Sequence, residues 1–154
     1  MLRDESGAIH AFVAGRTIVN TGTISPADAL KLADGIAAAG GTYVEAPVSG
    51  SRVPAETGTL VGLLAGPPDA VERVRQLIGP LCSRVEVCGE VPAALTMKLS
   101  ANVFLVSLLA GLAESFHFAE AHSMDLKVLR SILDAGQMAS PLSRVKTDKL
   151  VRGD

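Results

Sequence analysis

The sequence predicts an α/β fold that continues into an all-helical segment. Short β-branched runs alternate with helical patterns up to about residue 90, and only helical patterns follow. Glycines and prolines separate these runs, as expected for turns between strands and helices. We therefore expect two parts, residues 1–90 with a mainly parallel sheet and residues 91–154 with helices alone.

A strand–helix–strand unit is expected between residues 16 and 46. Residues 16–21 are β-branched and bounded by glycines, and residues 42–46 form the second strand. Between them Ser25 suits an N-cap and is followed by proline at the first helical position, so a helix should run to about Ala39. Ligands of parallel sheets bind beyond the carboxyl ends of the strands, where the turn before this helix lies.

The rest of the first part continues the alternation. The expected elements are a loop of small residues, a strand, a helix and a strand, at 47–52, 59–65, 68–78 and 83–88. Asp69 and Glu72 are three residues apart and are expected to form a capping pair on that helix. Cys82 and Cys88 are expected to be reduced thiols, and no metal-ligand spacing accompanies them.

The second part begins with an apolar stretch that predicts one long helix over residues 91–121, with Pro92 in its first turn. Residues 91–113 carry a single charge, Lys98, and the helix is expected to be buried. A membrane span is the alternative, which the polar residues spread around the helix disfavour. Two shorter helices are expected near 125–134 and 141–151.

Lys98 is the first candidate functional residue. An ammonium group in an apolar helix is costly unless something compensates it. The alternative is a lysine whose stem lies along the core while its head reaches water. Asn102 is four residues further on and shares one helix face with Lys98.

The composition of the chain limits the classes of partner that it is expected to bind. The chain has 14 basic and 16 acidic residues, a net charge of −2, one tyrosine and no tryptophan. No basic patch or aromatic platform indicates nucleic acid binding. The amino-terminal residues lack the apolar region of a signal peptide, and we expect a cytoplasmic protein with no membrane partner and no metal site.

Two further clusters stand near the ends of expected strands. Thr23 lies beside Ser25 in the turn before a helix, and Ser49 and Gly50 follow the second strand. A serine–glycine turn offers N–H and hydroxyl donors that suit a carboxylate or a phosphate, with an ordinary turn as the alternative. The sequence contains neither GxGxxG nor a Walker motif.

Three motifs in this order resemble the β-hydroxyacid dehydrogenase family, which includes 3-hydroxyisobutyrate dehydrogenase. They are TISP at 23–26, EAPVSGS at 45–51 and KLxxN at 98–102. The segment VSGSRVPAETGTL is most similar to the corresponding segment of the glyoxylate/succinic semialdehyde reductase branch. The resemblance implies that residues 1–90 are part of a Rossmann-type dinucleotide-binding domain and that residues 91–154 begin an all-α substrate and dimerisation domain.

The resemblance also implies an NAD(P)-dependent oxidoreductase. Such an enzyme transfers a hydride between NADP or NAD and a small β-hydroxyacid or carboxylated aldehyde. By resemblance, Lys98 is the general acid/base and Asn102 holds the substrate oxygen or the lysine. Ser49 and Gly50 grip the substrate carboxylate, and Thr23 contacts the cofactor.

The sequence departs from the family pattern in two ways. Pro92 and Ala94 stand where the family usually has glycines before the lysine. The phosphate-binding glycine turn and the remainder of the α-domain have no counterpart, so the chain by itself is expected to be inactive. The alternative is a non-catalytic interaction module that pairs through the long apolar helix, and homo-oligomerisation through that helix is expected in either case.

Overall fold

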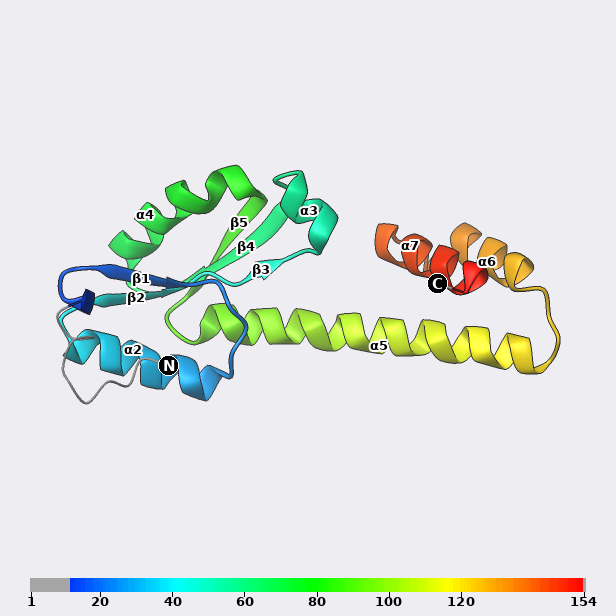
Figure 1. The fold of residues 1–154 in the computed structure, drawn as a ribbon, viewed down its shortest axis with the longest axis horizontal. Helices are drawn as coiled ribbons and strands as arrows, with labels where there is room; N and C mark the ends of the chain where they lie inside the picture. The colour runs from blue at the N-terminus through cyan, green and yellow to red at the C-terminus, as the bar shows by residue number, and fades with distance from the viewer. Residues whose placement is uncertain (1–11, 154) are drawn as a thin grey trace. The chain divides into compact units, whose positions relative to one another are not determined.

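A computed structural model of the chain describes residues 12–153, which divide into two compact units, one ending at Ser100 and the other beginning at Ala101. Figure 1 shows the order of the elements along the chain. The strands are β1 (Thr17–Asn20), β2 (Thr42–Glu45), β3 (Val48–Ser49), β4 (Leu60–Ala65) and β5 (Cys82–Gly89). The helices are α2 (Pro26–Ala38), α3 (Arg52–Glu56), α4 (Pro68–Ile78), the 3₁₀ turn η1 (Gly79–Leu81), α5 (Ala93–Ala121), α6 (Leu126–Ala135) and α7 (Pro141–Arg152).

The first unit is built on a five-stranded mixed sheet. β1 and β2 are parallel and in register from the Thr17–Thr42 pair to the Asn20–Glu45 pair, which confirms the predicted strand–helix–strand unit. β4 and β5 form a second parallel pair. The two pairs meet in antiparallel fashion at a single residue pair, Glu45 with Ala65. The α/β prediction is therefore confirmed, with the difference that the sheet is mixed rather than parallel throughout.

Residues 47–52 do not form the simple loop that was predicted. Val48 and Ser49 make the short strand β3, antiparallel to β4, and α3 follows at once. The Pro47 carbonyl accepts a hydrogen bond from the Leu63 N–H at 3.0 Å, so the chain reverses along β4 directly after β2. A strand of two residues is too short to produce an alternation pattern in the sequence.

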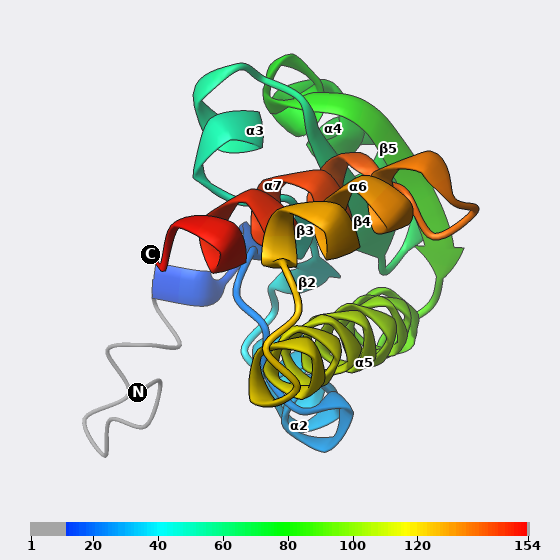
Figure 2. The ribbon, with the colours of Figure 1, turned by 90° about the vertical axis from the view of Figure 1, so that its right-hand side faces the viewer.

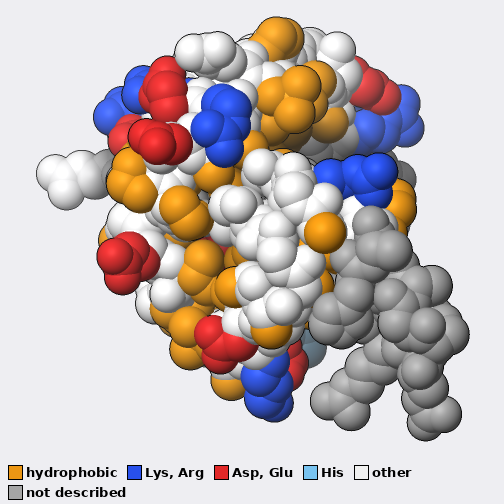
Figure 3. Space-filling model, turned by 90° about the vertical axis from the view of Figure 1, so that its left-hand side faces the viewer, with side chains coloured by type: hydrophobic (Ala, Val, Ile, Leu, Met, Phe, Trp, Pro, Cys, Tyr) orange, Lys and Arg blue, Asp and Glu red, His pale blue; other side chains and the backbone are white. Residues whose placement is uncertain are grey.

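Helices α2 and α4 cover opposite faces of this sheet (Figure 1). On the α4 side the buried core contains Val44 and Leu64, both with no exposed surface. On the α2 side Tyr43 packs with Ile36 and Val13. Successive β2 residues thus point to opposite faces, as the pleat requires. The face shown in Figure 3 carries side chains of both charge signs among exposed hydrophobic ones.

Two helix starts differ in how well the sequence predicted them. Ser25 caps α2, because its Oγ accepts a hydrogen bond from the Asp28 N–H at 3.1 Å, as predicted. The predicted capping pair of Asp69 and Glu72 on α4 is wrong. That helix already begins at Pro68 with Pro67 as the N-cap residue, so Asp69 lies inside the first turn and no side chain caps the helix end.

The long helix is confirmed, but its expected burial is wrong for the residues that the structure describes. α5 begins at Ala93, so Pro92 precedes it, and large hydrophobic side chains remain exposed on it: Met97, Val103, Phe104, Val106 and Phe118. An apolar face is buried only where another element covers it, which periodicity cannot reveal. Length and composition alone would let α5 cross a membrane, a property that core helices of soluble proteins share.

In the second unit, α6 and α7 lie side by side (Figure 2). Arg130 on α6 links them, because its guanidinium contacts Asp148 on α7 at 2.5 Å and Asp134 on its own helix at 3.5 Å. Asp125 caps α6, and Ser140 with Ser143 forms a capping box on α7. Local capping signals therefore define these two helices.

Candidate functional site

Lys98 lies in the second turn of α5 and is buried, with 9% of its surface exposed. Among residues 12–153 no carboxylate forms an ion pair with it. Burial lowers the pKa of Lys98 below its ordinary value, because the ammonium loses hydration. The Lys98 Nζ is not among the described side-chain atoms that are closed off from solvent without a partner, so a stem along the core with its head at the surface still fits. A lowered pKa makes the Lys98 ammonium a better proton donor than an ordinary lysine.

The start of α5 is attached to the end of β2 through Glu45. The Glu45 side chain has no exposed surface, and its Oε2 accepts hydrogen bonds from the Ala94 N–H at 3.0 Å and the Leu95 N–H at 3.2 Å. Burial raises the pKa of Glu45, and the two backbone hydrogen bonds oppose that rise. Glu45 was not among the predicted site residues. The available signal was an acidic residue inside the expected strand at 42–46.

Ser49 and Gly50 follow β2 after only a few residues. Ser49 pairs with Val61 of β4 and is half-buried, and its hydroxyl makes no hydrogen bond to a residue in the described part of the chain. Gly50 has φ = +140°, and a Cβ there would lie 2.6 Å from the Leu60 Cδ2 and 3.0 Å from the Pro54 Cβ. The positive φ favours glycine here, because a residue with a Cβ adopts it only under strain, and a Cβ would also crowd Pro54.

Thr23 lies exposed in the turn between β1 and α2. Asn20 at the end of β1 shapes this turn, because its Oδ1 accepts from the Gly22 N–H at 3.0 Å and its Nδ2 donates to the Tyr43 hydroxyl at 2.9 Å. Since Asn20 pairs with Glu45, the chain leaves β1 and β2 at the same carboxyl edge. The turn with Thr23 and the segment with Ser49 both start from that edge.

Asn102 is half-buried and lies one turn beyond Lys98 on α5, within the second unit. The first unit holds the other predicted site residues, Thr23, Ser49, Gly50 and Lys98. Glu45 joins the strand that leads to Ser49 with the helix that carries Lys98. In residues 12–153 no three histidine, cysteine or acidic side chains gather as a metal site would require.

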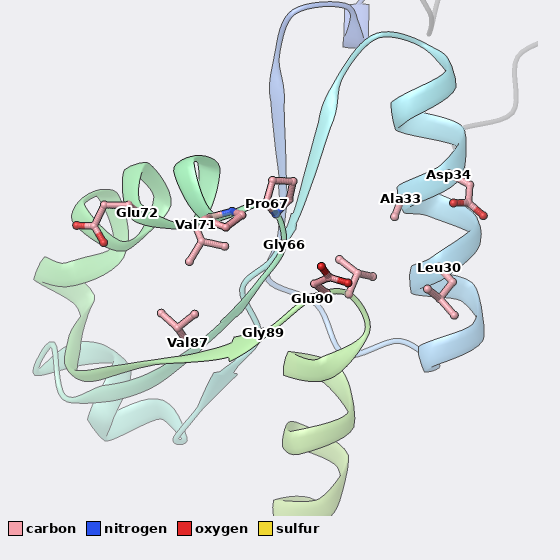
Figure 4. A pocket seen from close by; sticks show the side chains of 12 residues that line it. Leu30, Ala33, Asp34, Gly66, Pro67, Val71, Glu72, Val87, Gly89 and Glu90 are labelled. Carbon is pink, nitrogen blue, oxygen red and sulfur yellow. The ribbon is translucent and has the colours of Figure 1, made fainter.

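The first unit also contains a hollow of about 740 Å³. Its walls come from α2 on one side and from α4 and the end of β5 on the other (Figure 4). The residues around it include Leu30, Ala33, Asp34, Gly66, Pro67, Val71, Glu72, Val87, Gly89 and Glu90. None of the predicted site residues contributes to this wall, so the hollow is separate from them.

Comparison with known proteins gives consistent matches. Residues 1–89 match the family of the NAD binding domain of 6-phosphogluconate dehydrogenase. Glyoxylate/succinic semialdehyde reductase 1 of Arabidopsis thaliana is 31% identical over 143 residues, which are 93% of this chain and 50% of the plant protein. Cytokine-like nuclear factor N-PAC of Xenopus tropicalis is 30% identical over 149 residues, covering 97% of this chain and 28% of that protein.

Among solved structures, Psf3 in complex with NADP+ and 2-OPP superposes with a TM-score of 0.79 at 28% identity. The match covers 89% of this chain and 48% of that one. The chain thus spans about half the length of the plant reductase and of this solved structure. These matches confirm the predicted resemblance and the predicted fold class.

Proposed function

The chain belongs to the family of the NAD binding domain of 6-phosphogluconate dehydrogenase. We therefore propose that it functions as an NAD(P)-dependent oxidoreductase or as part of one. The proposed reaction transfers a hydride between the nicotinamide cofactor and a small β-hydroxyacid or carboxylated aldehyde. The observation that carries the proposal is Lys98, a buried lysine without an ion-pair partner in the described residues, held at the start of α5 beside the carboxyl end of β2.

Lys98 is proposed as the general acid/base. The nicotinamide cofactor, when bound, would supply the hydride chemistry. During reduction the Lys98 ammonium gives a proton from Nζ to the carbonyl oxygen, and during oxidation the neutral amine takes the proton of the hydroxyl group. The lowered pKa of Lys98 supports this role, because an acid/base works best when its pKa approaches the working pH.

Binding roles are proposed for four further residues. The Ser49 hydroxyl and the Gly50 N–H hold the substrate carboxylate, and the Asn102 amide holds the reacting oxygen or the Lys98 amine. Thr23 contacts the cofactor. The exposed Thr23 hydroxyl at the carboxyl edge of β1 and β2 suits a cofactor, since ligands of parallel sheets bind beyond that edge. We also propose that residues 1–90 belong to the dinucleotide-binding domain and residues 91–154 to the substrate and dimerisation domain. The proposed location of the protein is the cytoplasm.

The second candidate function is a non-catalytic module that pairs through α5. The exposed apolar side chains of α5, among them Phe104 and Val106, favour pairing because such faces are usually covered in solution. Pairing of two copies through α5 is proposed for the enzyme as well.

The decisive experiment measures NADPH oxidation with glyoxylate and with succinic semialdehyde by the full-length protein that carries this sequence. Lys98→Ala should lower kcat by about 100- to 10,000-fold, the contribution typical of a general acid/base. Lys127→Ala is the matched control, because Lys127 is an exposed lysine on α6. Turnover of Lys98→Ala within a few-fold of the wild type would refute the assignment. No turnover by the wild type, with self-association in sedimentation, would favour the second function.

A further inference from the structure

Glu45 is a fully buried acidic side chain that the proposed reaction does not use. Its Oε2 accepts two hydrogen bonds from the backbone of α5, whereas its Oε1 has no hydrogen-bond partner within residues 12–153. Burying a carboxylate costs free energy unless it is well compensated. Packing alone therefore does not explain why a carboxylate occupies this position in the core.

The start of α5 supplies that reason. The first N–H groups of a helix have no partner within the helix, and the helix end carries partial positive charge. Such groups are usually capped by a Ser, Thr, Asp or Asn side chain just before the helix. Val91 and Pro92, the two residues before α5, have no side-chain acceptor. Glu45 takes this role from a position 49 residues earlier than Ala94.

The capped residues lie one turn from Lys98. Ala94 precedes Lys98 by four residues, so the two side chains share one face of α5. On the other side, Glu45 precedes Ser49 by four residues, and the intervening Pro47 carbonyl is bonded to Leu63 of β4. Glu45 thus stands between the turn of α5 that leads to Lys98 and the short segment that leads to Ser49.

We propose that Glu45 is a positioning residue of the Lys98 site. It fixes the first turn of α5 to the end of β2 and so sets where the Lys98 ammonium stands relative to Ser49 and Gly50. This role rests on the proposed function, because Lys98 and Ser49 need a fixed relative position only if they act on one substrate. The other ionisable groups that feel the Glu45 charge are Tyr43 on β2 and Cys88 on β5.

The test uses two measurements that need neither cofactor nor activity. Hydrogen exchange reports the protection of the Ala94 and Leu95 amides. Amine acylation followed by mass spectrometry, repeated across pH, gives the midpoint at which Lys98 becomes reactive. The variants are Glu45→Ala, which removes the acceptor, and Glu45→Gln, which keeps one acceptor oxygen. The control is Glu90→Gln, because Glu90 is an exposed acidic residue close to the same helix start.

In Glu45→Ala the two amides should exchange about tenfold faster or more, the factor expected for losing hydrogen bonds to a charged group. The acylation midpoint of Lys98 should rise toward that of an ordinary lysine, because the freed helix start lets water reach the ammonium. Glu45→Gln should restore most of both properties, and Glu90→Gln should change neither.

Unchanged exchange in Glu45→Ala would overturn the proposal, and so would faster exchange with an unchanged Lys98 midpoint. If Glu45→Ala does not fold, Glu45→Asp is used instead. The aspartate side chain is shorter by one carbon–carbon bond, about 1.5 Å, so its carboxylate lies farther from the Ala94 and Leu95 N–H groups. The aspartate variant should shift both readouts in the same direction. These results are independent of turnover. An active Lys98→Ala enzyme would refute the assignment of Lys98 as the acid/base, whereas hydrogen exchange would still report on the contact between Glu45 and α5.

Discussion

Gly66→Ala should destabilise the first unit strongly. Gly66 directly follows β4, next to the point where Ala65 pairs with Glu45. It has φ = +147°, a conformation that an alanine adopts only under strain. A Cβ at this position would lie 2.9 Å from the Tyr43 carbonyl oxygen and 3.4 Å from the Val44 Cα. Both neighbours are backbone atoms of β2, so no side-chain rotation relieves the contact.

The expected cost combines two effects. Holding a non-glycine residue in a sparsely populated backbone region costs about 1–3 kcal/mol. Forcing an extra methyl group into a filled space costs about 1–3 kcal/mol more. The free energy of unfolding should therefore fall by about 3 kcal/mol, a large share of the stability of a small domain.

Gly35→Ala is the matched control. Gly35 lies inside α2, and a Cβ there would have no atom within 4 Å. The same chemical change should stabilise the protein by about 0.5–1 kcal/mol, because alanine favours helix more than glycine does. Urea unfolding followed by circular dichroism measures both variants. A Gly66→Ala protein within 0.5 kcal/mol of the wild type, at the resolution of such measurements, would refute the reasoning.

Three further substitutions test other parts of the structure. Lys98 has a folded-state pKa below its unfolded value, so its destabilising effect is complete below the folded pKa and disappears above the unfolded one. Lys98→Met should therefore be more stable than the wild type at pH 7, with a difference that shrinks as pH rises through that window, in urea titrations at several pH values. Ser25→Ala removes the bond to the Asp28 N–H and should cost about 1 kcal/mol in urea unfolding. Leu64→Ala truncates a side chain without exposed surface and should cost about 2–5 kcal/mol, seen as a lower Tm in thermal unfolding.

The sequence predicted those parts of the fold that depend on neighbouring residues. The β-branched run near β1, the Ser25 cap and the proline after it are local signals, and the structure agrees with each. Strand direction is not encoded in such patterns, so the antiparallel meeting of β2 and β4 could not be predicted. Whether α5 is covered depends on elements distant in sequence or on another chain, and its exposed face was missed for that reason.

The candidate site, like the fold, was predicted from the sequence only in part. The cost of a charge in an apolar helix singled out Lys98, and its burial agrees with that argument. Glu45 was missed because its partners, Ala94 and Leu95, are 49 and 50 residues away along the chain. The roles of Thr23 and Asn102 follow from family resemblance, and they stay predictions.

The two parallel pairs of the sheet, β1 with β2 and β4 with β5, meet at the Glu45–Ala65 pair, and the chain beyond β2 continues antiparallel along β4 through Pro47 and β3. The first turn of α5 is fastened at the same point through Glu45. One residue therefore takes part both in the junction of the sheet and in the start of the helix that carries Lys98, so a substitution at Glu45 acts on both.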